Sequence, residues 1–247
     1  MKRATIYRTC ILIAAVGPLE ILCLSGVIDN LTMQPPHRIV VDLARLISSG
    51  KLDGAILKTL TNAGVAVLLA ILAGVGAAVF LFRFRALRDV LDPLFATYYA
   101  IPVFAFYPLL IIVFGLGDAP QILMAFMLAV IVNTLNGLDR VPRVLLKTAR
   151  TSQMGPIETA LKIMLPSAAP YVLTGVKLVV AYALIGIIGA EFIMSRGGMG
   201  YEISFAYTNF DNATMYPLIL LILMISIGIN MGLARWERRL MRRRGQE

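Results

Sequence analysis

Few residues of this 247-residue chain could do chemistry in an apolar environment, and they are carboxylates and amides. Glu20 and Glu191 each lie within a long hydrophobic run. Ionisable residues in such positions are costly to bury and are functional candidates by default. Glu191 lies near one end of its run, where water can reach it. It therefore fits either a solute pathway or a structural role.

A second polar group, Asn133-Thr134-Leu135-Asn136, ends another apolar run. Amides within lipid need hydrogen-bond partners, so they either join neighbouring helices or line a polar path. We take Asn133, Thr134 and Glu191 as candidate residues of a translocation path.

Other kinds of chemistry are excluded by what the sequence lacks. The only histidine, His37, is in a predicted loop, so an intramembrane Ser–His protease centre has no histidine. Cys10 and Cys23 share one apolar run and form neither a C-x-x-C motif nor a disulfide framework. No G-x-x-x-x-G-K-[ST] motif occurs. We expect no catalytic residue, metal site or cofactor in this chain, so any ATP must be bound by another polypeptide.

The composition identifies the elements that must position these residues. Hydrophobic residues make up 59% of the chain and charged residues only 15%, whereas a soluble domain averages about 25% charged residues. Long continuous apolar runs predict helices rather than a barrel, whose strands would alternate. The fold expected is all-α, a single transmembrane domain over 1–247. The six predicted spans are 10–28, 60–82, 94–114, 119–138, 171–194 and 216–234.

Charge predicts the orientation of these spans. With the N-terminus in the cytoplasm, the inner segments 1–9, 83–93, 139–170 and 235–247 hold 17 of the 23 Lys and Arg residues, and the outer segments hold 5. The positive-inside rule therefore places both termini in the cytoplasm. The basic C-terminal run is a topology anchor beside membrane lipid, not a nucleic-acid site. Glu20 and the length of the first run favour an uncleaved span over a signal peptide.

Two spans have further features. Small residues recur at helical spacing in the second span, which fits packing within one bundle or a homodimer seam; they are Ala66, Ala70, Gly74 and Ala78. In the third span, Pro102 and Pro108 each remove a helix hydrogen bond. Their effect is either a broken helix near a pathway or a simple kink.

The cytoplasmic loop 139–170 is the most informative segment. Val144–Ser152 predicts a short helix with Lys147 and Arg150. A second helix is predicted to start at Pro156, after Gly155, and to end at Pro166. Its apolar residues recur at positions that should share one face, namely Ile157, Ala160, Leu161 and Met164. A loop with helices of its own suits docking of a partner better than a solvated connection.

Several short motifs occur in a fixed order, and together they resemble the membrane-spanning subunits of binding-protein-dependent ABC importers. The nitrate, sulfonate and taurine permease group is the most similar. The motifs are Leu91-Asp92-Pro93-Leu94, Ala100-Ile101-Pro102, Pro108-Leu109-Leu110-Ile111, Phe114-Gly115-Leu116-Gly117, Asn133-Thr134, Leu165-Pro166-Ser167-Ala168-Ala169-Pro170-Tyr171, Gly189-Ala190-Glu191-Phe192 and Gly198-Met199-Gly200-Tyr201.

In that family, a cytoplasmic motif of E-A-A, three residues, G, nine residues and I-x-L-P docks on the ATPase. Aligned on Leu165-Pro166, this chain has Lys147-Thr148-Ala149 in place of E-A-A and Gln153 in place of the glycine. Gly155 follows two residues later. The resemblance therefore implies these ATPase-docking residues: Lys147, Ala149, Arg150, Gln153, Met154, Gly155, Ile163, Leu165 and Pro166.

The resemblance implies a type I importer in a bacterial inner membrane. Two copies of the chain would pair, two ABC ATPase subunits would dock on the coupling helices of 139–170, and an extracytoplasmic substrate-binding protein would deliver a small solute. Sulfonates, taurine, nitrate and vitamin precursors are the solutes of such permeases. The chain itself would be a transport subunit, not an enzyme. The alternative, an ion-coupled secondary transporter, would require internal repeats, and the sequence has no convincing repeat.

Overall fold

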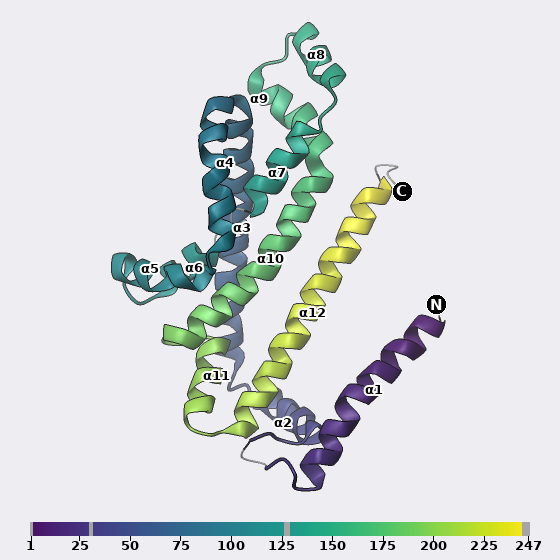
Figure 1. Cartoon of the computed structure of the whole chain (residues 1–247), viewed down its shortest axis with the longest axis vertical. Coiled ribbons are helices and arrows are strands. Elements are labelled where there is room, and N and C mark those ends of the chain that lie inside the picture. The colour runs from purple at the N-terminus through teal and green to yellow at the C-terminus, as the bar shows by residue number, and fades with distance from the viewer. Residues whose placement is uncertain (1, 30–31, 126–128, 244–247) are drawn as a thin grey trace.

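The computed structural model describes residues 2–29, 32–125 and 129–243, and within these ranges the chain is helical and has no strand. The predicted all-helical class is therefore confirmed. In chain order, the elements of Figure 1 are α1 (Lys2–Leu24), α2 (Pro36–Ser48), α3 (Asp53–Arg83), α4 (Arg85–Ala100), η1 (Val103–Phe106), α5 (Tyr107–Phe114), α6 (Asp118–Ala125), α7 (Ala129–Asp139), α8 (Arg143–Thr151), α9 (Pro156–Thr159), η2 (Ala160–Met164), α10 (Leu165–Met194), α11 (Met199–Thr208) and α12 (Asn212–Arg243).

Three continuous helices are long and apolar enough to cross a membrane within the described ranges. They are Asp53–Arg83, Pro156–Met194 and Asn212–Arg239, and they contain the predicted second, fifth and sixth spans. Two shorter apolar helices, Ile13–Leu24 and Phe104–Phe114, lie within the predicted first and third spans. The six-span count stays a prediction.

The third predicted span is not a single helix. In the third, α4 ends at Ala100, and the one-turn helix η1 and then α5 follow. Pro102 precedes η1 in an extended conformation and Pro108 lies in the first turn of α5, where a missing backbone N–H does no harm. Of the two alternatives for the third span, the broken helix is therefore the one observed, because the helix stops before Pro102 and restarts around Pro108. The fourth comprises α6 and α7, and residues 126–128 lie outside the described residues.

The small residues of α3 pack inside the protomer. Ala66, Ala70 and Ala78 are fully buried, and a Cβ at Gly74 would lie 2.8 Å from the Cβ of Val130 in α7. Such residues let helices approach closely where no bulky side chain separates them. The intramolecular alternative is therefore correct for this stripe.

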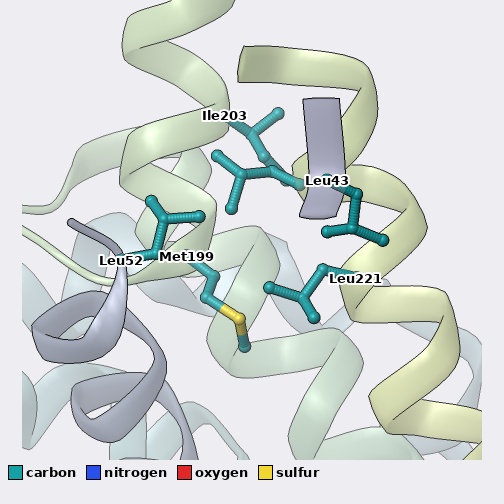
Figure 2. Close-up of a cluster of buried hydrophobic side chains, with 6 residues drawn as sticks. Leu43, Leu52, Met199, Ile203 and Leu221 are labelled. Carbon is teal, nitrogen blue, oxygen red and sulfur yellow. The ribbon is translucent and has the colours of Figure 1, made fainter. Parts of the chain in front are cut away.

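The long helices run between two ends of the molecule. Figure 1 places α8 and α9 beyond one end of α10, and α11 and α2 beyond the other. At the α2–α11 end, one buried cluster joins α2, α11 and α12; Figure 2 shows five of its members converging. The cluster consists of Leu43, Leu52, Met199, Ile203, Leu218 and Leu221. A dry apolar core therefore fixes the start of α12 against the helices of this end.

Candidate functional site

At the α8–α9 end, helix α8 presents positive charge. It begins after Pro142 and ends at Thr151, one residue earlier at each end than predicted. Ala149 is buried, whereas Lys147 and Arg150 are exposed. Arg143, at the start of α8, is exposed as well. One side of α8 therefore packs onto the protein and leaves three cations exposed to a partner.

A left-handed turn ends α8 at Gln153. The N–H of Met154 donates to the carbonyl oxygen of Ala149 (3.0 Å), and the N–H of Gln153 donates to that of Arg150 (3.0 Å). This pair of bonds is the Schellman motif, whose left-handed residue is usually glycine. Gln153 has φ +52°, so it adopts the conformation that a glycine would adopt without strain. Gln153, which aligns with the glycine of the family motif, thus occupies a backbone position that favours glycine.

The next helix does not end at Pro166, contrary to the prediction. The chain is helical from Pro156 to Met194, and its turn over Ala160–Met164 is a π-helix. There the N–H of Leu165 reaches back five residues to the carbonyl oxygen of Ala160. Because Pro166 then lies in the first turn of α10, its missing N–H does not break the helix.

The apolar residues of this helix lie on two sides. Ile157 is 74% exposed and Leu161 is 61% exposed, whereas Ala160 and Met164 pack against Leu138. The prediction that the four apolar residues share one face is therefore wrong, because only Ala160 and Met164 lie on the side that packs on α7.

The exposed residues form a hollow of about 530 Å³ at this end. It is lined by Gly155, Pro156, Ile157, Glu158, Leu161 and Lys162. Lys162 donates to Glu158 (2.6 Å), so its charge is paired within the chain. Helix α8 holds further cations of this end, Lys147 and Arg150 among them. Of the predicted docking residues, Lys147, Arg150, Gln153, Gly155 and Pro166 are exposed, Met154, Ile163 and Leu165 are half-buried, and Ala149 is buried. Exposed apolar side chains beside cations suit a protein partner.

At the other end of α10, Glu191 is only 1% exposed and is hydrogen-bonded on several sides. The hydroxyl of Thr59 donates to its carboxylate oxygens at 2.8 and 3.0 Å, and the N–H of Gly200 donates at 3.0 Å. The Thr59 oxygen in turn accepts the N–H of Met199 at 2.8 Å. The carboxylate thus joins α3, α10 and the start of α11.

Glycine allows this close approach. A Cβ at Gly200 would overlap the backbone oxygen of Ile188 and lie 2.8 Å from the Cβ of Glu191. Gly198 has φ +107°, and a Cβ there would overlap the Glu191 carboxyl group. The Gly-Met-Gly motif therefore serves to bring backbone against a buried side chain.

A second set of bonds fixes the segment between α10 and α11. The Tyr107 hydroxyl donates to the carbonyl oxygen of Met194 (2.8 Å), and the Gln121 amide donates to the Ser195 hydroxyl (3.0 Å). Asn62 donates to Gln121 (3.3 Å), and Lys58 pairs with Asp118 (3.2 Å). None of these partners was predicted from the sequence. A signal was present, since Thr59 and Asn62 occur three residues apart, which is one helical face.

The two other candidate path residues lie in α7. Thr134 is buried, and its hydroxyl oxygen has no hydrogen-bond partner among the described residues. Asn133 is half-buried. A buried hydroxyl without a partner is unusual and calls for an explanation such as a functional role.

Ion pairs between helices were also missed. Arg88 donates to both carboxylate oxygens of Asp139 (2.8 and 2.7 Å), and this bonding raises the pKa of the Arg88 guanidinium. Lys177 of α10 pairs with Glu237 of α12. Glu20 accepts the backbone N–H of His37 (3.1 Å) and pairs with its ring. These pairs join helices that are distant in sequence, which sequence spacing cannot reveal.

Comparison with known proteins places this geometry in context. The family described as "Binding-protein-dependent transport system inner membrane component" matches residues 66–246. The putative aliphatic sulfonates transport permease protein SsuC of Bacillus subtilis (strain 168) is 32% identical over 199 residues, or 74% of this chain and 69% of SsuC. The taurine transport system permease protein TauC of Escherichia coli (strain K12) is 25% identical over 221 residues, or 86% of this chain and 80% of TauC.

A solved structure is also similar. An inward-facing structure of the MetNI methionine ABC transporter matches 76% of this chain and 95% of its own chain, with a TM-score of 0.64 and 18% identity. At that identity the likeness concerns the fold alone, and it agrees with the helical arrangement described above.

Proposed function

Because the chain belongs to the family of binding-protein-dependent transport system inner membrane components, we propose that it is the membrane-spanning subunit of an ATP-driven importer that works with an ABC ATPase and a substrate-binding protein. The family predicted from the ordered motifs is confirmed. Within it, the chain is an inner-membrane ABC permease for small solutes.

Docking of the ATPase is proposed at the α8–α9 end. The single observation that supports it is the exposed pair Ile157 and Leu161, which lies at one end of the helix running from Pro156 to Met194. A push on these side chains acts on one end of a continuous helix whose other end carries Glu191. ATPase closure would therefore move both ends of α10 together.

Crosslinking tests this docking. With Cys10 and Cys23 replaced by serine, Met154→Cys or Gly155→Cys should crosslink to the ATPase in the assembled transporter. Ser49→Cys, exposed at the α2–α11 end, is the matched control and should not react with it. If only cysteines in the basic C-terminal segment react, the proposed docking surface is wrong.

The α2–α11 end is proposed as the extracytoplasmic gate. The bonds of Glu191 hold α3, α10 and α11 together, so a path that opens at this end must loosen them. Thr134, whose buried hydroxyl lacks a partner in the described structure, is proposed together with Asn133 to meet the solute deeper in the path. The binding protein would deliver its cargo here, and a second copy of the chain would complete the path.

Sulfonates related to those of SsuC and TauC are the proposed solute class. Both termini and the loop 139–170 are proposed to be cytoplasmic. Reporter fusions after Arg88 and Arg150 should then report the cytoplasm, and fusions after Asp118 and Asn212 the opposite side. A cytoplasmic report at Asn212 would overturn the topology.

A further inference from the structure

Three aromatic side chains are exposed at the C-terminal end of α11. Phe205 is 56% exposed, Tyr207 62% and Phe210 80%. The inward side of the helix is separate, because Met199 and Ile203 belong to the buried cluster of Figure 2. We call Phe205, Tyr207 and Phe210 the aromatic girdle. Phe205 stacks on Tyr201 with ring centroids 6.2 Å apart, but all three side chains stay more than half exposed.

Phe210 is also in an unfavourable backbone conformation, which adds to the significance of its exposed side chain. The N–H of Asp211 donates to the carbonyl oxygen of Ala206 (2.8 Å), and the N–H of Phe210 donates to that of Tyr207 (3.2 Å). This is again the Schellman pattern, and Phe210 has φ +55° in the left-handed position. A side chain there costs about 1–2 kcal/mol relative to glycine. A large, exposed phenylalanine at that position therefore suggests a use outside the chain's own fold.

The length of α12 gives the depth of the girdle. Tyr216 and Trp236 are twenty positions apart in this helix, and no charged residue lies between Tyr216 and Arg235. At 1.5 Å per residue their separation is about 30 Å, which is the thickness of the hydrocarbon core. Tyr216 and Trp236 therefore mark the two boundaries of that core, because Tyr and Trp gather at such boundaries. Phe210 precedes Tyr216 and falls at headgroup depth.

The arrangement of the girdle favours lipid over a protein surface. Phe205 and Tyr207 are two positions apart in a helix, so they project about 200° apart around its axis. A protein partner contacts one face of a helix, whereas the headgroup layer can surround its end. Polar neighbours at this end, Asn209 and Asp211, are also exposed, as the interfacial zone requires.

We propose that the C-terminal end of α11 is inserted into the phospholipid headgroup layer at the α2–α11 face, with the aromatic girdle as its anchor. This anchor fixes the depth of the connection between α10 and α12. It depends on the membrane crossing of α12 and not on the identity of the transported solute.

Tryptophan fluorescence provides the test, because the chain has a single tryptophan, Trp236. In a Trp236→Phe background, Phe210→Trp introduces one indole, and the protein is reconstituted in phosphatidylcholine vesicles with bromines either near the headgroup or near the acyl chain end. We expect strong quenching by the shallow bromines and weak quenching by the deep ones. Phe205→Trp should behave in the same way.

The matched control is Ile157→Trp in the same background. Ile157 is 74% exposed, similar to Phe210, but lies on the proposed docking surface, so neither lipid should quench it. Absence of quenching at position 210 would overturn the lipid anchor. In that case, an emission shift on addition of the binding protein would identify a protein-docking surface, and self-crosslinking of Phe210→Cys would identify a contact between copies.

Discussion

The two ends of α10 are stabilised in opposite ways. At the α11 end, Glu191 is buried and bonded to Thr59 and Gly200, and no Cβ could be added at Gly200 without a clash. At the α9 end, Gly155 has open space around it and Ile157 faces the solvent. The polar groups around Glu191 are hydrogen-bonded within their own chain, whereas the α9 end of the helix presents an exposed apolar surface. This difference is consistent with the proposed gate at the α11 end and with the proposed docking of the ATPase at the α9 end.

The largest effect is expected from removal of the buried carboxylate. Glu191→Ala leaves the Thr59 hydroxyl and the Gly200 N–H without an acceptor, at about 1–3 kcal/mol each. Thermal unfolding in detergent should show a clear loss of stability. Glu158→Ala, at the other end, removes an exposed pair with Lys162, so its effect should be much smaller than that of Glu191→Ala. If the two substitutions lowered the melting temperature equally, the α11 end would not be more strongly stabilised than the α9 end.

The second prediction compares the stability effects of alanine at two glycine positions, one at each end of the helix. Gly200→Ala places a methyl group against the backbone of Ile188, and such overpacking costs about 1–3 kcal/mol. Gly155→Ala meets nothing within 4 Å and has an ordinary φ of −65°. Its cost should be confined to the weaker preference for alanine at the N-cap, so it should lower the melting temperature less than Gly200→Ala. A tolerated Gly200→Ala would mean that α11 does not pack on α10 as described.

Charge reversal on the docking surface should separate function from stability. Lys147→Glu alters an exposed residue, so we expect a stability change of about 0–1 kcal/mol and unchanged membrane insertion. If the ATPase presents an acidic residue to Lys147, ATP hydrolysis coupled to transport should fall, and an acidic-to-basic change on the ATPase should restore it. If ATP hydrolysis stays normally coupled to transport in Lys147→Glu, the charge of Lys147 has no part in ATPase docking.

The smallest effect concerns the two left-handed turns. Gln153→Gly relieves a left-handed side chain, and part of the gain is lost to the more flexible unfolded chain. We expect a net stabilisation of about 0.5–1 kcal/mol, and Phe210→Gly should give a similar value in detergent. Coupled ATP hydrolysis should distinguish them, because only Gln153 is proposed to contact the ATPase. An unfolding midpoint lowered by both substitutions would argue against the left-handed conformation.

The sequence alone predicted the all-helical membrane fold and the permease family, because apolar runs, prolines and ordered motifs are local patterns. It also located α8 to within one residue, since proline and the spacing of apolar residues define that helix. The site was only partly predictable. Glu191 stood out as a carboxylate in an apolar run, but its partner Thr59 is 132 residues away in the chain.

The point where the helix ends and the side of it that is buried were known only from the three-dimensional structure. Pro166 predicted a helix end, yet the π-turn before it lets the helix continue, because the carbonyl group of Ala160 bonds to Leu165 and the proline needs no N–H. Ile157 is exposed in the same helix, whereas Met164 is buried against Leu138, which belongs to another helix. Which side of a helix is buried depends on the helices packed against it, and that packing joins residues whose separation in sequence has no fixed period.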